Sequence, residues 1–72
     1  MTPVQCRMAR TLLDLKRADL AKLSGVSEKA IGNFETGRSK LIRANHETLQ
    51  RTLEGLGVEF TEGDGVKRRE GQ

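Results

Sequence analysis

A glycine at position 25 separates two short runs that both have the pattern of a helix, and this arrangement constrains the fold more than any other feature of the chain. Residues 17–24 carry apolar side chains at helical spacing, and glycine ends a helix well because it adopts the left-handed conformation without a steric penalty. Ser27 is a good N-cap and Glu28 places a negative charge in the first turn, so a second helix is predicted over 28–35. Two helices joined by a turn of about three residues form a helix-turn-helix.

The apolar residues of this segment have the sizes that such a bend requires. Ala21 is small enough to let the two helices approach closely. The residues placed to fill the angle between the helices are Leu20, Val26, Ile31 and Phe34. A plain helical hairpin is the alternative for a pattern of two helices, but these sizes, together with the basic loop "GRSKLIR" that follows, favour a DNA-binding helix-turn-helix.

A helix is expected before this segment. Thr2 can cap it, Pro3 suits its first position, and Gln5 can complete a capping box, so the helix is predicted to begin here and to end near Asp14. Its predicted apolar face comprises Val4, Met8 and Leu12, flanked by Cys6, Ala9 and Leu13, and its opposite face comprises Gln5, Arg7 and Thr11.

A fourth helix is expected after the basic loop. Asn45 is its predicted N-cap, and its apolar residues recur at helical spacing up to the glycines at positions 55 and 57. These apolar residues are Leu49, Leu53 and Leu56. The predicted fold is therefore mainly α, a compact four-helix domain over residues 1–57.

Residues 58–72 are predicted to form a short C-terminal β-hairpin or tail. Runs "VEF" and "VKRR" flank "TEGDG", in which Asp64-Gly65 is a strong turn signal, and a frayed polar tail is the alternative. A hairpin of two strands is marginal in water, so Val58, Phe60 and Val66 must pack on the helices or on another chain. Those three residues are therefore a candidate dimer interface. The last residues, "RREGQ", are expected to be disordered.

The charge of the chain suits a polyanionic partner. The formal net charge is +3. Residues 1–57 hold ten Lys or Arg against six Asp or Glu, a net charge of +4, whereas residues 58–72 hold three against four, a net charge of −1. The basic excess therefore belongs to the predicted helical domain.

Several other classes of protein are not expected. Cys6 is the only cysteine, which fits a reducing cytoplasm, and it leaves no disulfide and no cysteine-rich metal site. Arg7 and Arg10 interrupt the first apolar run, so neither a signal peptide nor a membrane span is predicted. His46, the sole histidine, is expected to be exposed in the first turn of the last helix. No catalytic constellation is visible, and no metal or cofactor is expected.

Residues 8–58, with "DLAKLSGVSEKAIGNFETGR" as the specific core, resemble the helix-turn-helix of Cro and the lambdoid phage repressors, the XRE family. The usual fifth helix of that family is missing. The resemblance implies that the helix over 28–35 enters the major groove of DNA while the preceding helix lies across the backbone. The base-contacting positions that it implies are Ser27, Glu28, Lys29 and Asn33.

Chemistry gives these positions roles. Lys29 can donate to guanine, Asn33 can pair with adenine, and Glu28 can accept from the amino group of cytosine. Gly32 stands where the family commonly has a polar residue, and no base is assigned to it. Each of these residues is, in the alternative reading, an ordinary exposed helix residue.

Basic residues around the helix-turn-helix are predicted to contact DNA phosphates. They are Lys16, Arg17, Arg38, Lys40 and Arg43. Arg17 starts a helix, where the free N–H groups favour anions, and Lys16 replaces the usual capping serine or asparagine. Loop charges are often merely solvated, so the assignment of the others depends on their location. The resemblance also implies a structural ion pair between Arg10 and Glu35.

The sequence therefore favours a DNA-binding transcriptional regulator. Its simplest form is a small homodimeric repressor, with autoregulation as one means of control, bound to double-stranded DNA at a palindromic operator. The alternative is an antitoxin or protein-interaction adaptor with the same fold. An enzyme is the weakest interpretation.

Overall fold

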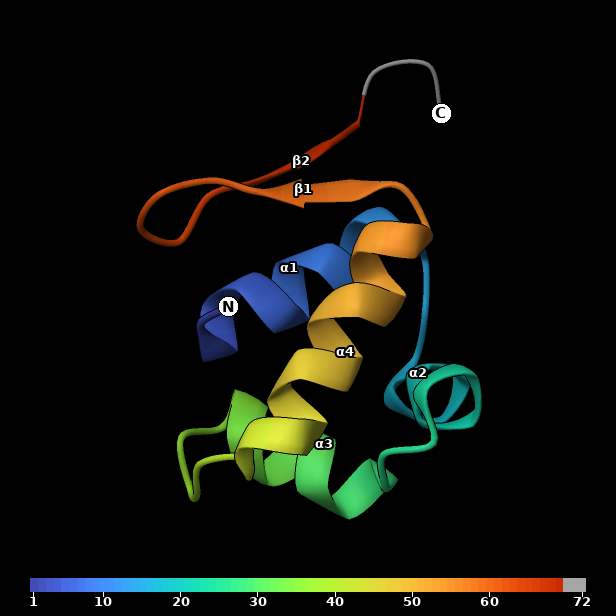
Figure 1. The fold of residues 1–72 in the computed structure, drawn as a ribbon, viewed down its shortest axis with the longest axis vertical. Coiled ribbons are helices and arrows are strands. Elements are labelled where there is room, and N and C mark those ends of the chain that lie inside the picture. Colours follow the sequence, from blue (N-terminus) through green and yellow to red (C-terminus); the bar gives the residue numbers. More distant parts are fainter. Residues whose placement is uncertain (70–72) are drawn as a thin grey trace.

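The computed structural model describes residues 1–69, which form a helical domain followed by a hairpin (Figure 1). The elements are α1 (Pro3–Leu12), α2 (Arg17–Ser24), α3 (Glu28–Glu35), α4 (Arg43–Gly55), β1 (Val58–Phe60) and β2 (Val66–Arg68). The predicted fold, four helices with a C-terminal hairpin, is confirmed. None of the helices within residues 1–69 is both long and apolar enough to cross a membrane.

The turn between α2 and α3 forms as its residue types predict. Gly25 adopts a φ of 79°, and its N–H donates to Ala21 O at 2.8 Å. The hydroxyl of Ser27 accepts from the N–H of Ala30 at 3.1 Å and so caps α3. The bend therefore depends on a left-handed glycine and a serine cap that lie two residues apart.

A single hydrophobic core lies between the four helices and the hairpin. All four residues predicted to fill the helix-turn-helix angle are buried in it. The core comprises Cys6, Ala9, Leu20, Val26, Ile31, Phe34, Leu49, Leu53 and Val58. Val58 is 1% exposed, so this candidate dimer residue packs inside its own chain. Phe60 and Val66 pack against the same core and are partly buried.

The predicted capping box of α1 is present, and Cys6, Ala9, Leu12 and Leu13 face the core as predicted, but the predicted apolar face is wrong at Val4 and Met8. Val4 and Met8 are 36% and 42% exposed, whereas Gln5 is only 3% exposed. The reason is the hairpin: the side-chain amide of Gln5 donates to the carbonyls of Thr61 and Gly65, both at 2.9 Å. A polar side chain is buried here because distant main-chain groups satisfy it.

The start of α4 also differs from the prediction. The helix begins at Arg43 with Ile42 as its N-cap, and Asn45 lies within the first turn. His46 is partly buried instead of exposed, because its ring packs against that of Phe34 in a T-shaped arrangement and its Nε2 lies 2.8 Å from Met1 O. The histidine therefore joins the chain terminus to the core.

The hairpin pairs Glu59 with Lys67 at its centre in an antiparallel register. The left-handed residue of the turn is Gly63, with a φ of 71°. A Cβ at Gly65 would meet the hydroxyl of Thr61, so the Thr61 side chain would have to shift to accept one. The turn is thus longer than the tight two-residue form.

The predicted disorder of "RREGQ" is wrong for its first two residues. Arg68 belongs to β2 and donates to Leu12 O, and the N–H of Arg69 donates to Gly57 O, both at 2.8 Å. Residues 70–72 lie outside the described part of the chain.

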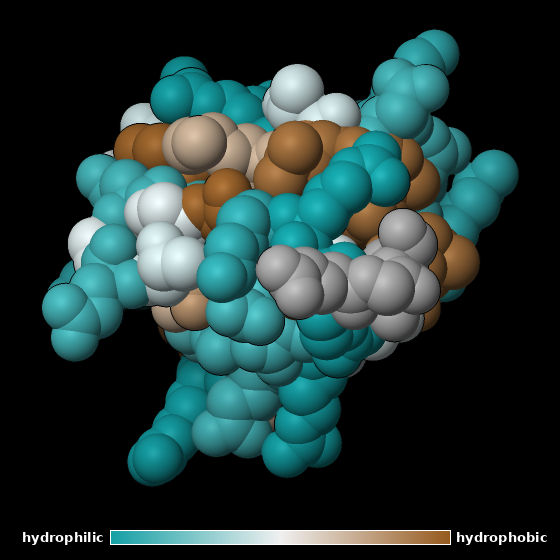
Figure 2. Space-filling view, turned by 90° about the horizontal axis from the view of Figure 1, so that it is seen from above, coloured by the Kyte–Doolittle hydropathy of each residue, from teal (hydrophilic) through white to brown (hydrophobic). Residues whose placement is uncertain are grey.

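The hairpin and α3 lie at opposite ends of the molecule, with α1 and α4 between them (Figure 1). Seen from the hairpin end, hydrophobic residues remain exposed among hydrophilic ones (Figure 2). The fold therefore presents two distinct ends, one formed by the sheet and one by the helix that follows the turn.

Candidate nucleic-acid interface

The helix α3 has one face in the core and one at the surface. Ile31, Phe34 and Glu35 are buried, whereas Glu28 and Lys29 are exposed. This division follows from the period of the helix, because positions three and four apart share a face. The side chains predicted to meet DNA bases therefore project from a helix that the core holds in place.

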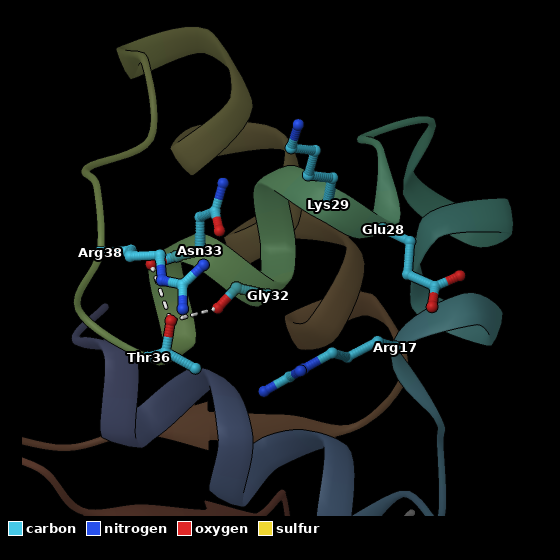
Figure 3. A pocket seen from close by; sticks show the side chains of 7 residues that line it. All are labelled: Arg17, Glu28, Lys29, Gly32, Asn33, Thr36 and Arg38. Atoms are coloured by element: carbon cyan, nitrogen blue, oxygen red, sulfur yellow. Dashed lines mark hydrogen bonds between the residues drawn. The ribbon is translucent and has the colours of Figure 1, made fainter.

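The surface beside α3 is hollowed, and we call this feature the recognition hollow (Figure 3). It is lined by Arg17, Glu28, Lys29, Gly32, Asn33, Thr36 and Arg38. The lining thus carries three cations and one carboxylate. Lys29 and Asn33 project from one side of α3, and Arg17 runs along the other side toward Thr36 (Figure 3). The hollow can accept a polyanion together with groups that hydrogen-bond.

Beneath the hollow, the carboxylate of Glu35 is fully buried and binds two arginines. Arg10 donates from Nε and Nη2 to the two carboxylate oxygens, each at 2.7 Å. Arg17 donates from Nε to Oε1 at 3.0 Å. The thiol of Cys6 donates to Oε2 at 3.3 Å. Glu35 therefore connects α1, α2 and α3 at a single point.

The electrostatics of this cluster follow from its burial and its partners. Burial alone would raise the pKa of Glu35, but the hydrogen bonds from Arg10 and Arg17 outweigh it and hold the pKa below its ordinary value. The hydrogen bond to Glu35 raises the pKa of Arg10. Burial, reinforced by the nearby carboxylate, raises the pKa of the Cys6 thiol to about 12. Cys6 is thus a core residue and not a nucleophile.

The comparison with known protein families decides the class. A family model described as helix-turn-helix, of the Cro/C1 type, matches residues 7–62. The chain belongs to the XRE family of helix-turn-helix proteins. No curated protein matches it in a sequence search. DNA-binding regulation is the function of this family, and the match spans the helix-turn-helix and β1.

The other predicted contact residues of this XRE protein do not line the recognition hollow. Lys16 and Ser27 sit at the two N-caps, and the Lys16 N–H is held by Asp19 Oδ2 at 3.0 Å. Lys40 is exposed and borders a second hollow, which also includes Phe34 and His46. Arg43 is exposed at the first position of α4, and its Nε lies 3.5 Å from Oε1 of Glu47. All of them except Ser27 are basic, and all are exposed in this structure.

Two features of the XRE site were not anticipated from sequence. Thr36 lines the recognition hollow, and its hydroxyl donates to Gly32 O at 2.9 Å. The spacing could have indicated Thr36, because it lies one helical turn beyond Gly32. The bond between Arg17 and Glu35 could not have been found in this way, since these residues lie 18 positions apart. Within residues 1–69, no group of three or more potential ligands could hold a metal ion.

Proposed function

We propose that this protein is a sequence-specific transcriptional regulator that reads DNA through the exposed face of α3, and that it most simply acts as a small repressor. One observation carries the proposal: the face that the XRE fold directs toward DNA bears Lys29 and Asn33, and two nearby arginines, Arg17 and Arg38, line the same hollow. A repressor without a ligand-binding domain in residues 1–69 would act by covering its operator.

The roles within the reading face follow from the chemistry of base edges. Lys29 donates to guanine O6 and N7, and Asn33 pairs with N6 and N7 of adenine. Glu28 is exposed beside them and accepts from the amino group of cytosine, or repels bases that offer only acceptors. Ser27 keeps its hydroxyl proton for DNA while its oxygen caps α3. Each group lies in or beside the first two turns of the helix, as groove entry requires.

The proposed phosphate contacts come from residues at or beside the ends of α2, α3 and α4. Lys16 stands at the start of α2, and Arg38 and Lys40 follow α3. Arg43 begins α4, where its side chain is 93% exposed. Each charge that meets a phosphate releases a counterion, so binding should weaken steeply with added salt.

A homodimer on a palindromic operator is part of the proposal, and the fold restricts how it forms. The hairpin and α3 lie at opposite ends of the chain (Figure 1). Stacking two sheets face to face would direct the two α3 helices away from each other. Pairing two strand edges around an axis perpendicular to the sheet instead leaves both α3 helices on the same side. Phe60 and Val66 are the residues of the hairpin core face that such an edge contact can still reach.

Selection of bound sequences from random DNA tests the function directly. The purified chain should enrich a sequence with two related half-sites about one helical turn apart. A retarded complex should then form on that sequence with no second protein present. Binding that shows no sequence preference at any salt concentration would contradict the proposal. Binding that appears only after a partner protein is added would favour the antitoxin or adaptor.

A further inference from the structure

Gly32 leaves a space on α3 that the side chain of Arg17 fills. A Cβ built at Gly32 would lie 3.5 Å from Arg17 Nη1, 3.8 Å from Cζ and 3.9 Å from Cδ. These are ordinary contact distances, so a methyl group fits, and a longer side chain would compete with the guanidinium for the same space. Arg17 belongs to α2, yet its guanidinium lies against the surface of α3 (Figure 3).

The guanidinium is anchored at one nitrogen and available at the other two. Its Nε donates to the buried Oε1 of Glu35 at 3.0 Å. Within residues 1–69, Nη1 and Nη2 have no hydrogen-bond acceptor, and the side chain, 38% exposed, lines the recognition hollow. Two parallel N–H groups of a guanidinium match two oxygens of a phosphate.

We propose that Gly32 and Glu35 are positioning residues, which together hold Arg17 in advance in the orientation that binds a DNA phosphate in the recognition hollow. Glu35 fixes one edge of the guanidinium, and the missing side chain at Gly32 lets the other edge reach the hollow. An arginine that is already held loses less freedom when DNA arrives, and so binds more tightly than a mobile one. Gly32 thus determines affinity without contacting DNA. The inference rests on the proposed function.

Matched substitutions at one position test it. Gly32→Ala keeps Arg17 in place, whereas Gly32→Gln displaces it. On the selected operator, Gly32→Gln should weaken binding about tenfold, as Arg17→Ala does, because both remove a charge-assisted contact. The plot of log K against log salt has a negative slope, and in both variants it should be less steep by about 0.9, the value for one lost phosphate contact. Gly32→Ala should leave affinity and slope unchanged.

The double variant shows whether Gly32 acts through Arg17. If it does, Gly32→Gln should have no further effect on binding once Arg17 is alanine. Additive losses would overturn the inference, since glutamine would then act on DNA by itself. An unchanged affinity in Gly32→Gln would overturn it as well.

A readout without DNA separates this inference from the proposed function. In the unbound protein, the Nε–H proton of Arg17 should give a slowly exchanging NMR signal in the wild type and in Gly32→Ala, and should lose that protection in Gly32→Gln. Rapid exchange in the wild type would contradict the anchoring of Arg17 whether or not DNA binds. Retained protection in Gly32→Gln would show that Gly32 does not position Arg17.

Discussion

Glu28 and Glu35 begin and end the same helix of eight residues, yet the fold uses them in opposite ways. Glu35 has no exposed side-chain surface and accepts from Cys6, Arg10 and Arg17. Glu28 is exposed on the rim of the recognition hollow. The carboxylate of Glu35 is bonded inside the fold, and the carboxylate of Glu28 remains accessible to a partner. The difference separates the residues that hold α3 in place from those that can read DNA.

The largest expected effect is the difference in stability between the alanine variants of these two glutamates. Glu35→Ala leaves two guanidinium groups without their acceptor in or near the core, so the free energy of unfolding should fall by about 3–5 kcal/mol. Glu28→Ala removes only an exposed charge at the helix start and should change it by less than about 1 kcal/mol. Urea unfolding of both variants gives the comparison. Equal losses would contradict the division of the helix.

A smaller effect on stability is expected at the hairpin end, where Gln5 is another polar side chain that is buried and hydrogen-bonded inside the fold. Gln5→Leu removes the donations to Thr61 and Gly65 and should lower the free energy of unfolding by about 2 kcal/mol. The amides of the hairpin should then exchange faster with solvent. Thr11→Ala, on the exposed side of α1, is the control and should change stability by less than about 0.5 kcal/mol. Unaltered exchange in Gln5→Leu would show that the amide does not anchor the hairpin.

A substitution on the exposed side of α3 should change DNA recognition and leave the stability of the fold unchanged. Lys29→Ala should reduce discrimination at one base pair of the operator by about 1–3 kcal/mol, because it removes a donor to a base edge. Its urea unfolding should match that of the wild type. Sequence selection with the variant measures the first quantity. A preserved preference at every base pair would remove Lys29 from the reading face.

The smallest expected effect is the change in the stability of the fold under mildly acidic conditions. Because the folded pKa of Glu35 is below its ordinary value near 4.5, its ion pairs stabilise the fold fully above that value. This contribution is lost as the pH falls through the folded pKa. Stability should therefore decline only below about pH 4.5, as far as Glu35 is concerned. Unfolding of wild type and Glu35→Gln from pH 6 to pH 3 checks this, and parallel profiles would contradict it.

The sequence was sufficient where structure depends on neighbouring residues. Gly25 and Ser27 act on the main chain within a few positions, so the boundaries of α2 and α3 could be predicted closely. The capping box of Thr2 and Gln5 is equally local. Helix caps and turns of this kind can be predicted from a single sequence, because they depend on residues a few positions apart.

The sequence was insufficient where a side chain meets a distant partner. Gln5 is buried because carbonyls 56 and 60 positions away accept from it, and no periodicity reveals such a match. His46 is drawn inward by Met1, 45 positions away. Arg17 was predicted as a phosphate contact from its place at a helix start, but its bond to Glu35 depends on the packing of α2 against α3. Polar burial is a property of the tertiary fold.

The contact surface on DNA tests the central claim most directly. Amide NMR signals of the chain should be compared with and without the selected operator, at a stated salt concentration. The largest changes should fall on residues 27–38 and on the N–H groups that begin α2, and the hairpin end should change little unless a second chain pairs with it. Specific binding with its largest changes on β1, β2 and the start of α1, and none on α3, would contradict the account.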